Sequence, residues 1–311
     1  MNRLSYFFLA TSLALALVFL AADCAEAGRH GHGVNITTHG DRPVTDCSQL
    51  DIRYDDMETA RAEQQLTIPR AQAPTLTVHA AHNGGVTVVG ADRDTYAVKA
   101  CKAAGADDRA GAQRLLDRVT VNFSNGTLTP QGPGDEDDWV IYLIIEAPRN
   151  AGLDLEAHNG PLDVRDLAGT IKLDTVNGPI GIRRSFGQIE ARAQNGPIDI
   201  TAGGGSLHLS TQNGPISVEL LGTRWEGAGL EVHAVNGPLT LTLPPNYQSG
   251  VRVEAENFAP FHCGIEACAN ARKEWNDNIR SVEFGASSPV VRLSTVNGPI
   301  SIGSTRKRDT L

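Results

Sequence analysis

The chain has 311 residues and a formal net charge of −9 at pH 7, from 27 basic and 36 acidic side chains. This acidic balance argues against a nucleic acid as partner, because nucleic-acid binding needs a basic surface that neutralises phosphates. The basic cluster Arg306-Lys307-Arg308 is a short tail, and such tails are ordinarily solvated. The length suits one large elongated domain or two ordinary ones.

Residues 1–27 are predicted to be a cleaved signal peptide. Arg3 is a short basic region, an uncharged apolar run follows over 4–22, and Ala25-Glu26-Ala27 gives a small-x-small cleavage pattern. We therefore expect an exported, periplasmic or extracellular protein. Two alternatives remain: the run 4–22 is nearly long enough to stay as a membrane anchor, and Cys24 is a candidate for lipidation.

The cysteines agree with export, since the mature part has an even number of them. Cys263 and Cys268 close a short loop and are predicted to form a local disulfide. This pairing leaves Cys47 to bond Cys101. Zinc binding is not expected, because no paired Cys-x-x-Cys is present.

No cofactor is predicted. His30 and His32, in a His-Gly tail, are the single weak alternative, as a site for copper, nickel or zinc. The other candidate ligands, His158, His208 and His233, fall in three different columns of the repeat described next, so they do not suggest a shared metal site.

The strongest signal is a repeat of Asn-Gly-Pro followed by Leu or Ile. The first three steps are 18 residues each and the next is 23. Asn257 begins a degenerate copy that lacks the Gly-Pro, and Asn83 begins a weaker early copy. The complete copies begin at Asn159, Asn177, Asn195, Asn213, Asn236 and Asn297. A fixed period of this kind indicates stacking of one supersecondary unit.

Each copy predicts two short strands flanking the turn. Leu153, Leu155 and Ala157 alternate with polar residues before the first Asn, and Leu162 and Val164 do so after it. No helical pattern fits between copies, which excludes an alternating α/β sheet. One copy therefore predicts one rung of a parallel β-solenoid.

The turn residues have a physical explanation. Asn tolerates the left-handed region, Gly takes positive φ, and Pro fixes φ for the next strand. Stacked rungs would place equivalent Asn side chains about 4.8 Å apart, so that their amides form a hydrogen-bonded ladder. All seven Asn residues, Asn257 included, are thus predicted to be structural.

The rest of the chain is less regular. One helix is expected over Ala106–Arg118, with Ala110, Leu115 and Leu116 on its apolar side. The predicted parts after the signal peptide are a flexible segment (28–60), an initial capping part of the solenoid (61–150), the regular repeats (151–303) with a cysteine-bearing insert (258–289), and a tail (304–311).

Three stretches together carry a resemblance to a known family: Val140–Arg149, the run LDLEAHNGPLDVRDLAGTIKLDTVNGPI from Leu153, and GGVTVVGADRD followed by the expected helix. Over about residues 60–303 the sequence resembles the putative-adhesin β-strand-repeat family of bacterial envelope proteins. The resemblance implies a right-handed parallel β-solenoid that is exported or membrane-attached, with no catalytic residues to transfer. The sequence departs from the family in its cysteine-bearing insert and in the lack of an evident surface anchor. Both departures weaken the hypothesis that the protein acts directly in cell adhesion.

These observations predict a non-catalytic, adhesin-like structural or binding scaffold of the cell envelope. Its partner would be a glycan or an envelope protein. The aromatic residues where the repeat breaks are the binding candidates, since insertions often carry recognition; they are Trp225, Trp275, Phe258 and Phe261. Alternatively, they cover the hydrophobic end of the solenoid, because a cap is required.

Two other functions remain open. Glu156 and Asp174 occupy one column in adjacent rungs, near Lys172 and Arg192, as a carbohydrate-active lyase or hydrolase would need. Alternating charges on a solvated strand face produce the same group without catalysis, and no Gly-x-Ser-x-Gly, His-Glu-x-x-His or phosphate loop is present. An envelope stress or sensing component acting through a membrane partner is the third function.

Overall fold

The computed structural model describes residues 33–38, 44–80, 83–134, 137–257, 260–276 and 279–305. All of them belong to one compact unit, His32–Leu311, while the other unit, Met1–Gly31, lies outside the described residues. The predicted signal peptide, His30, His32 and Phe258 therefore also lie outside them. Among the described residues, no helix combines the length and the apolar character needed to span a bilayer.

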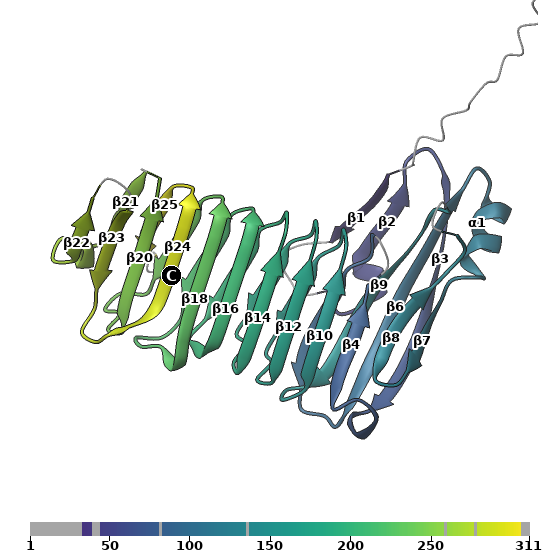
Figure 1. Cartoon of the computed structure of the whole chain (residues 1–311). Coiled ribbons are helices and arrows are strands. Elements are labelled where there is room, and N and C mark those ends of the chain that lie inside the picture. Colours follow the sequence, from purple (N-terminus) through teal and green to yellow (C-terminus); the bar gives the residue numbers. More distant parts are fainter. Residues whose placement is uncertain are drawn as a thin grey trace, which may run out of the picture. The chain divides into compact units, whose positions relative to one another are not determined.

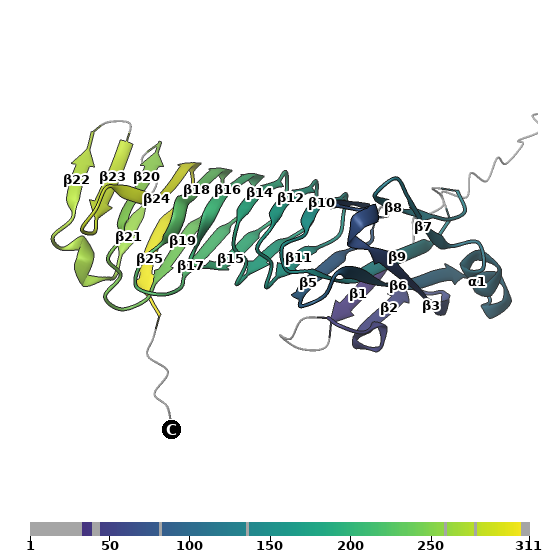
Figure 2. The same ribbon diagram turned by 90° about the horizontal axis from the view of Figure 1, so that it is seen from below.

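The described part is all-β with one α-helix, and most of its strands belong to two large sheets (Figures 1 and 2). The first sheet contains, from edge to edge, β22 (Arg272–Trp275), β23 (Ile279–Phe284), β20 (Gly250–Glu256), β24 (Pro289–Asn297), β18 (Glu226–Asn236), β16 (Gly204–Asn213), β14 (Gln188–Ala193), β12 (Thr170–Thr175), β10 (Gly152–Ala157), β4 (Thr75–His79), β8 (Thr127–Gln131) and β7 (Thr120–Ser124). The second contains β21 (Phe261–Cys263), β25 (Ile300–Ser304), β19 (Leu239–Leu243), β17 (Ile216–Leu220), β15 (Ile198–Ala202), β13 (Ile180–Arg183), β11 (Leu162–Arg165), β5 (Val86–Ala91), β9 (Trp139–Pro148), β6 (Thr95–Ala106) and β3 (Glu58–Pro69). A small third sheet pairs β1 (Val34–Thr38) with β2 (Leu50–Tyr54).

The repeat sets the register of the parallel strands. β10 and β12 are parallel with Leu153 opposite Ile171, and β11 and β13 are parallel with Leu162 opposite Ile180. Both pairs join residues one 18-residue copy apart, and the same step continues from β12 to β14 and β16. Antiparallel pairs occur toward the ends, including β20 with β23 and β6 with β9, so both large sheets are mixed.

The core lies between the inward faces of the two large sheets. Alternate residues of each strand point inward, as in Leu153 and Leu155 of β10 and Val164 of β11, and they join one continuous hydrophobic cluster. Burial of each such side chain contributes about 1.5–3 kcal/mol. The predicted alternation of apolar and polar residues is confirmed on these strands.

The last copies do not stack in sequence order. β24 lies between β18 and β20, and β25 between β19 and β21 (Figure 1, yellow strand β24). Val291 of β24 is opposite both Leu230 of β18 and Val251 of β20. Along the chain, β20 and β21 of the degenerate copy come first, followed by β22 and β23 and then by β24 and β25. In the sheets, however, β24 and β25 are the direct neighbours of β18 and β19.

The N-terminal half departs from the repeat. β3 pairs antiparallel with β6, and β6 with β9. The predicted helix is observed as α1 (Arg109–Leu116), and the Asp108 side chain caps it by accepting a hydrogen bond from the Gly111 N–H at 2.6 Å. Ala112 and Leu116 are the buried helix residues, and Ala110 is exposed, contrary to the prediction.

Residues 28–60 were expected to be flexible, but their described part contains β1, a 3-10 turn (Cys47–Gln49), β2 and the start of β3. Leu50 and Ile52 of β2 pack on Val140 and Tyr142 of β9 in a second small core. The apolar alternation of β2 was too short to identify from sequence, and its partner face on β9 is created only by the fold.

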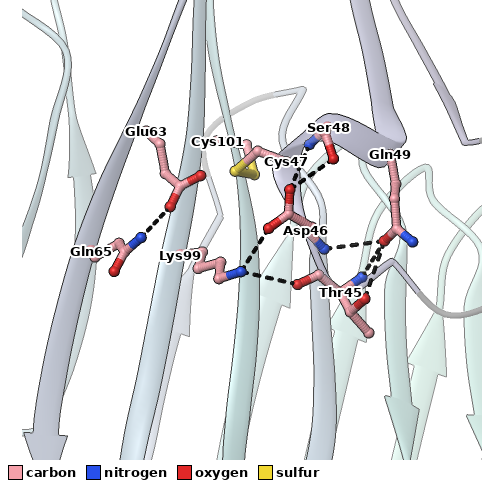
Figure 3. A network of polar contacts seen from close by, with 9 residues as sticks. All are labelled: Thr45, Asp46, Cys47, Ser48, Gln49, Glu63, Gln65, Lys99 and Cys101. Carbon is pink, nitrogen blue, oxygen red and sulfur yellow. Dashed lines mark hydrogen bonds and ion pairs between the residues drawn. A yellow bond between two sulfur atoms is a disulfide. The ribbon is translucent and has the colours of Figure 1, made fainter.

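A disulfide and an ion pair, together called the clamp here, tie the segment around Cys47 to β6 (Figure 3). Cys47 and Cys101 form the expected disulfide, with their Cα atoms 5.4 Å apart, and Lys99 Nζ lies 2.7 Å from Asp46 Oδ2. Hydrogen bonds from Lys99 and then Ser48 hold the pKa of Asp46 well below its usual range. The second expected pair, Cys263 with Cys268, is also joined. Two further 3-10 turns span Arg70–Gln72 and Glu266–Cys268.

Candidate binding groove

The Asn side chains form a continuous ladder of hydrogen bonds. Asn195 Nδ2 donates to Asn177 Oδ1 at 2.9 Å, and Asn213 Nδ2 donates to Asn195 Oδ1 at 2.9 Å. At the end of the ladder the order follows the inserted strand, since Asn297 donates to Asn236 and Asn257 donates to Asn297. The full sequence is Asn83, Asn159, Asn177, Asn195, Asn213, Asn236, Asn297 and Asn257.

The turn glycines of five of the six Asn-Gly-Pro copies serve a different purpose from the predicted one, since among them Gly237 alone has positive φ, at 158°. None of the six Asn residues of the Asn-Gly-Pro copies has positive φ, whereas Asn257 of the degenerate copy does, at 50°. A Cβ at Gly178 would lie 2.0 Å from the Gly160 carbonyl oxygen, and one at Gly196 would lie 2.1 Å from that of Gly178. Glycine is therefore needed because successive turns approach too closely for any side chain.

Next to this ladder, the outward face of the first sheet carries a groove of about 770 Å³. Its lining comes from six strands, β4, β10, β12, β14, β16 and β18, and from the residues that follow them. One wall is formed by residues three positions before the Asn: Glu156, Asp174, Arg192, Ser210 and His233. The other wall is formed by residues one position before it: His158, Val176, Gln194, Gln212 and Val235.

The two carboxylates and the arginine of the groove each contact a side chain of the opposite acid–base type on the same face. Glu156 Oε2 lies 2.9 Å from His79 Nδ1, and Asp174 Oδ2 lies 2.7 Å from Lys172 Nζ. Asp174 raises the pKa of Lys172, mainly through this hydrogen bond. Arg192 is paired with Glu190 on its own strand.

The structure places the two acidic candidates side by side, since Glu156 is the register partner of Asp174. Asp174 is in turn opposite Arg192. This is the column that the sequence predicts. The structure adds that each of the two carboxylates contacts a basic side chain, His79 for Glu156 and Lys172 for Asp174.

The aromatic candidates do not meet in this groove. Trp225 is buried, with an exposed fraction of 7%, and its Nε1 donates to the Gly205 carbonyl at 3.1 Å. Its use as an exposed binding residue is thus contradicted, because it fills the core beside β16. Phe261 packs partly buried against the same core. Trp275 is 61% exposed on the edge strand β22, with Arg280 5.9 Å from its ring centroid.

Sequence reasoning missed the groove as a site. Its signal is present in the repeat, because small residues two positions before the Asn, such as Ala157, Thr175 and Ala193, separate two outward columns. Residues Ser210 and Gln212 were not identified, since neither is conspicuous without the neighbouring strands. Within the part of the chain that the structure describes, no group of three or more His, Cys, Asp or Glu side chains is arranged to hold a metal ion.

Comparisons with known proteins find similarity among solved structures alone. No family model and no curated protein matches the chain. A "putative cell adhesion protein" from Clostridium sporogenes is 12% identical with a TM-score of 0.33, covering 79% of this chain and 100% of that one. A "putative adhesin" from Bacteroides fragilis is 10% identical with a TM-score of 0.39, covering 79% and 97%. A "putative lipid binding protein" from Parabacteroides distasonis is 9% identical with a TM-score of 0.27, covering 79% and 97%.

The first two of these structures are described as adhesion proteins, the class that the sequence resembles. At such identities and TM-scores the similarity supports no statement about what this chain binds.

Proposed function

We propose that this chain is an exported, non-catalytic scaffold of the cell envelope that presents the outward face of its first sheet as a binding surface. The observation that carries the proposal is the groove of about 770 Å³ bordered by two columns of side chains that advance one strand at a time. Hydrogen-bonded strands keep these columns at a fixed spacing of about 4.8 Å. A rigid periodic surface suits a long partner, either a glycan or an envelope protein.

Export is supported by composition and by the disulfides. Residues 1–27 have the pattern of a signal peptide. Cys47–Cys101 and Cys263–Cys268 both pair, which suits an oxidising compartment. N-terminal sequencing of the exported protein tests this part, and a chain that keeps residues 4–22 would instead be membrane-anchored.

The repeats are further proposed to form a right-handed parallel β-solenoid with 18-residue rungs. The support is the 18-residue offset between parallel neighbours from β10 to β16 in the first sheet and from β11 to β17 in the second. Residues 61–150 then act as its capping part, since β3, β6 and α1 depart from the parallel pattern there.

The non-catalytic part of the proposal is supported by the carboxylates themselves. Glu156 contacts His79 and Asp174 contacts Lys172. Acid–base catalysis by two carboxylates needs environments that push their pKa values apart, usually through burial of one of them. Both of these side chains instead lie on the solvated outer face, where 47% of the Glu156 side chain and 31% of the Asp174 side chain is exposed.

The test incubates the purified exported protein with peptidoglycan, lipopolysaccharide, and plant and bacterial glycans. Retention on the polymer and release of new sugar ends are measured in the same samples. We expect retention without release. Release that disappears in the Glu156→Gln variant would make the protein a carbohydrate-active enzyme. Absence of both signals would reject the polymer-binding role and leave a structural role or an envelope-protein partner.

A further inference from the structure

The groove crosses its strands at a right angle to their direction, because its lining residues come from the same two positions on each successive strand. Six neighbouring strands at about 4.8 Å spacing extend over about 24 Å. A ligand lying along the groove therefore meets side chains at equivalent positions once per strand. Its own repeat must match the strand spacing.

The chemistry of the walls favours a hydroxyl-rich ligand. Ser210, Gln194 and Gln212 both donate and accept hydrogen bonds, Arg192 donates and Asp174 accepts. Apolar atoms lie between and beside them, from Ala157, Ala193, Val176 and Val235. Sugar rings present hydroxyl groups at their edges and C–H groups on their faces, so they match both features.

Two other polymers fit less well. An extended peptide repeats every two residues, at about 6.6–6.8 Å, and falls out of step with the strands. A polyanion would gain Arg192, but it also meets Glu156 and Asp174 in the groove and a chain of net charge −9 around it. A sugar ring with its linkage is about as long as the strand spacing, so successive rings lie opposite successive strands.

We infer that this groove binds a linear, uncharged glycan along its length, with about one sugar per strand. The inference rests on the proposed binding scaffold and names its ligand. Among the described residues that line the groove there is no Phe, Tyr or Trp, so no single sugar is held by stacking on one of these rings. Affinity must then accumulate from many similar contacts, and it should depend strongly on chain length.

The experiment titrates the purified protein with cello-oligosaccharides and chito-oligosaccharides of increasing length by calorimetry. We expect affinity to rise with each added sugar and to level off at about six sugars, the span of the lined strands. Affinity that does not change beyond the disaccharide would overturn the inference. Equal or tighter binding of oligogalacturonates, which are acidic, would overturn it as well.

Paired variants locate the site. The double variant Ser210→Ala, Gln212→Ala removes one polar group from each wall at β16, and we expect at least tenfold weaker binding of the six-sugar chain. The control Gln188→Ala, Ser206→Ala removes the same residue types from the same face, at the other ends of β14 and β16, where the two residues are register partners outside the groove. A loss of equal size in both double variants would overturn the assignment of the groove.

The outcomes separate this inference from the proposed function. Retention on peptidoglycan or lipopolysaccharide without any binding of the neutral oligosaccharides would reject the glycan-filled groove and leave the scaffold in place. Absence of retention on every polymer would reject this inference together with the polymer-binding part of the proposed function, and would leave a structural role or an envelope-protein partner.

Discussion

Replacement of Gly196 by alanine tests whether close stacking of the turns dictates the repeat. The new Cβ would lie 2.1 Å from the Gly178 carbonyl oxygen, which is backbone and cannot rotate away. Ordinary contact begins at about 3.5 Å, so the two turns must separate by about 1.4 Å. Separation on this scale would also stretch the 2.9 Å bond between Asn195 and Asn177. We expect a loss of about 3 kcal/mol, the upper part of the range for overpacking.

Gly303 provides the matched control, because a Cβ there meets no atom within 4 Å and its φ is not positive. Gly303→Ala should leave stability unchanged or raise it by about 0.5 kcal/mol through the lower entropy of the unfolded chain. Urea denaturation followed by circular dichroism gives both free energies of unfolding, provided that the slopes of the transitions agree with wild type. If the two variants differ by less than about 0.5 kcal/mol, the packing explanation for the turn glycines is refuted.

Three further predictions concern the ladder and the clamp. Asn195→Ala removes one donated and one accepted amide bond, each 2.9 Å, and should cost about 1–2 kcal/mol in urea denaturation; Asn195→Asp keeps the acceptor but sets a carboxylate oxygen against Asn177 Oδ1 in place of the donor, so it should cost no less, and wild-type stability in either variant would contradict the ladder. Replacing Cys47 and Cys101 by serine opens a loop of sequence separation 54 and should cost about 4 kcal/mol; a transition that is unchanged relative to the oxidised wild type would show that the disulfide does not hold β2 in place. Asp46 has a lowered pKa because of its bond with Lys99, so the stability it provides is present above the ordinary carboxyl pKa of about 3.9 and is lost as the pH falls through the lowered value. The stability difference between wild type and Asp46→Asn should therefore shrink as the pH falls below about 4. A difference that grows under acid would contradict this direction of the pH dependence.

Local sequence patterns predicted much of the fold because they depend on neighbours along the chain. The alternation in Leu153 and Leu155 requires a strand with one buried face. The 18-residue period requires equivalent residues to stack, and the Asn ladder follows from that stacking. The cysteine pairing was also accessible, since a short loop joins Cys263 to Cys268 and leaves one other pair.

The candidate site was predicted only in part. The column of Glu156 and Asp174 follows from the repeat alone. The groove beside it does not, because a hollow is a property of several strands together. Trp225 shows the same limit: an aromatic residue in an extra-long copy has the same sequence whether it faces solvent or fills the core.

The sequence by itself determined the strands of the regular copies, the period, the helix and the cysteine pairs, since each is set by a pattern within one copy or one short loop. The tertiary structure alone decided that β24 inserts between β18 and β20, because a strand with a standard register can pair on either side of any other copy. It also decided why the turns need glycine, since the Cβ of Gly196 is excluded by the carbonyl of a turn 18 residues away. Contacts across that distance are three-dimensional, and no local pattern contains them.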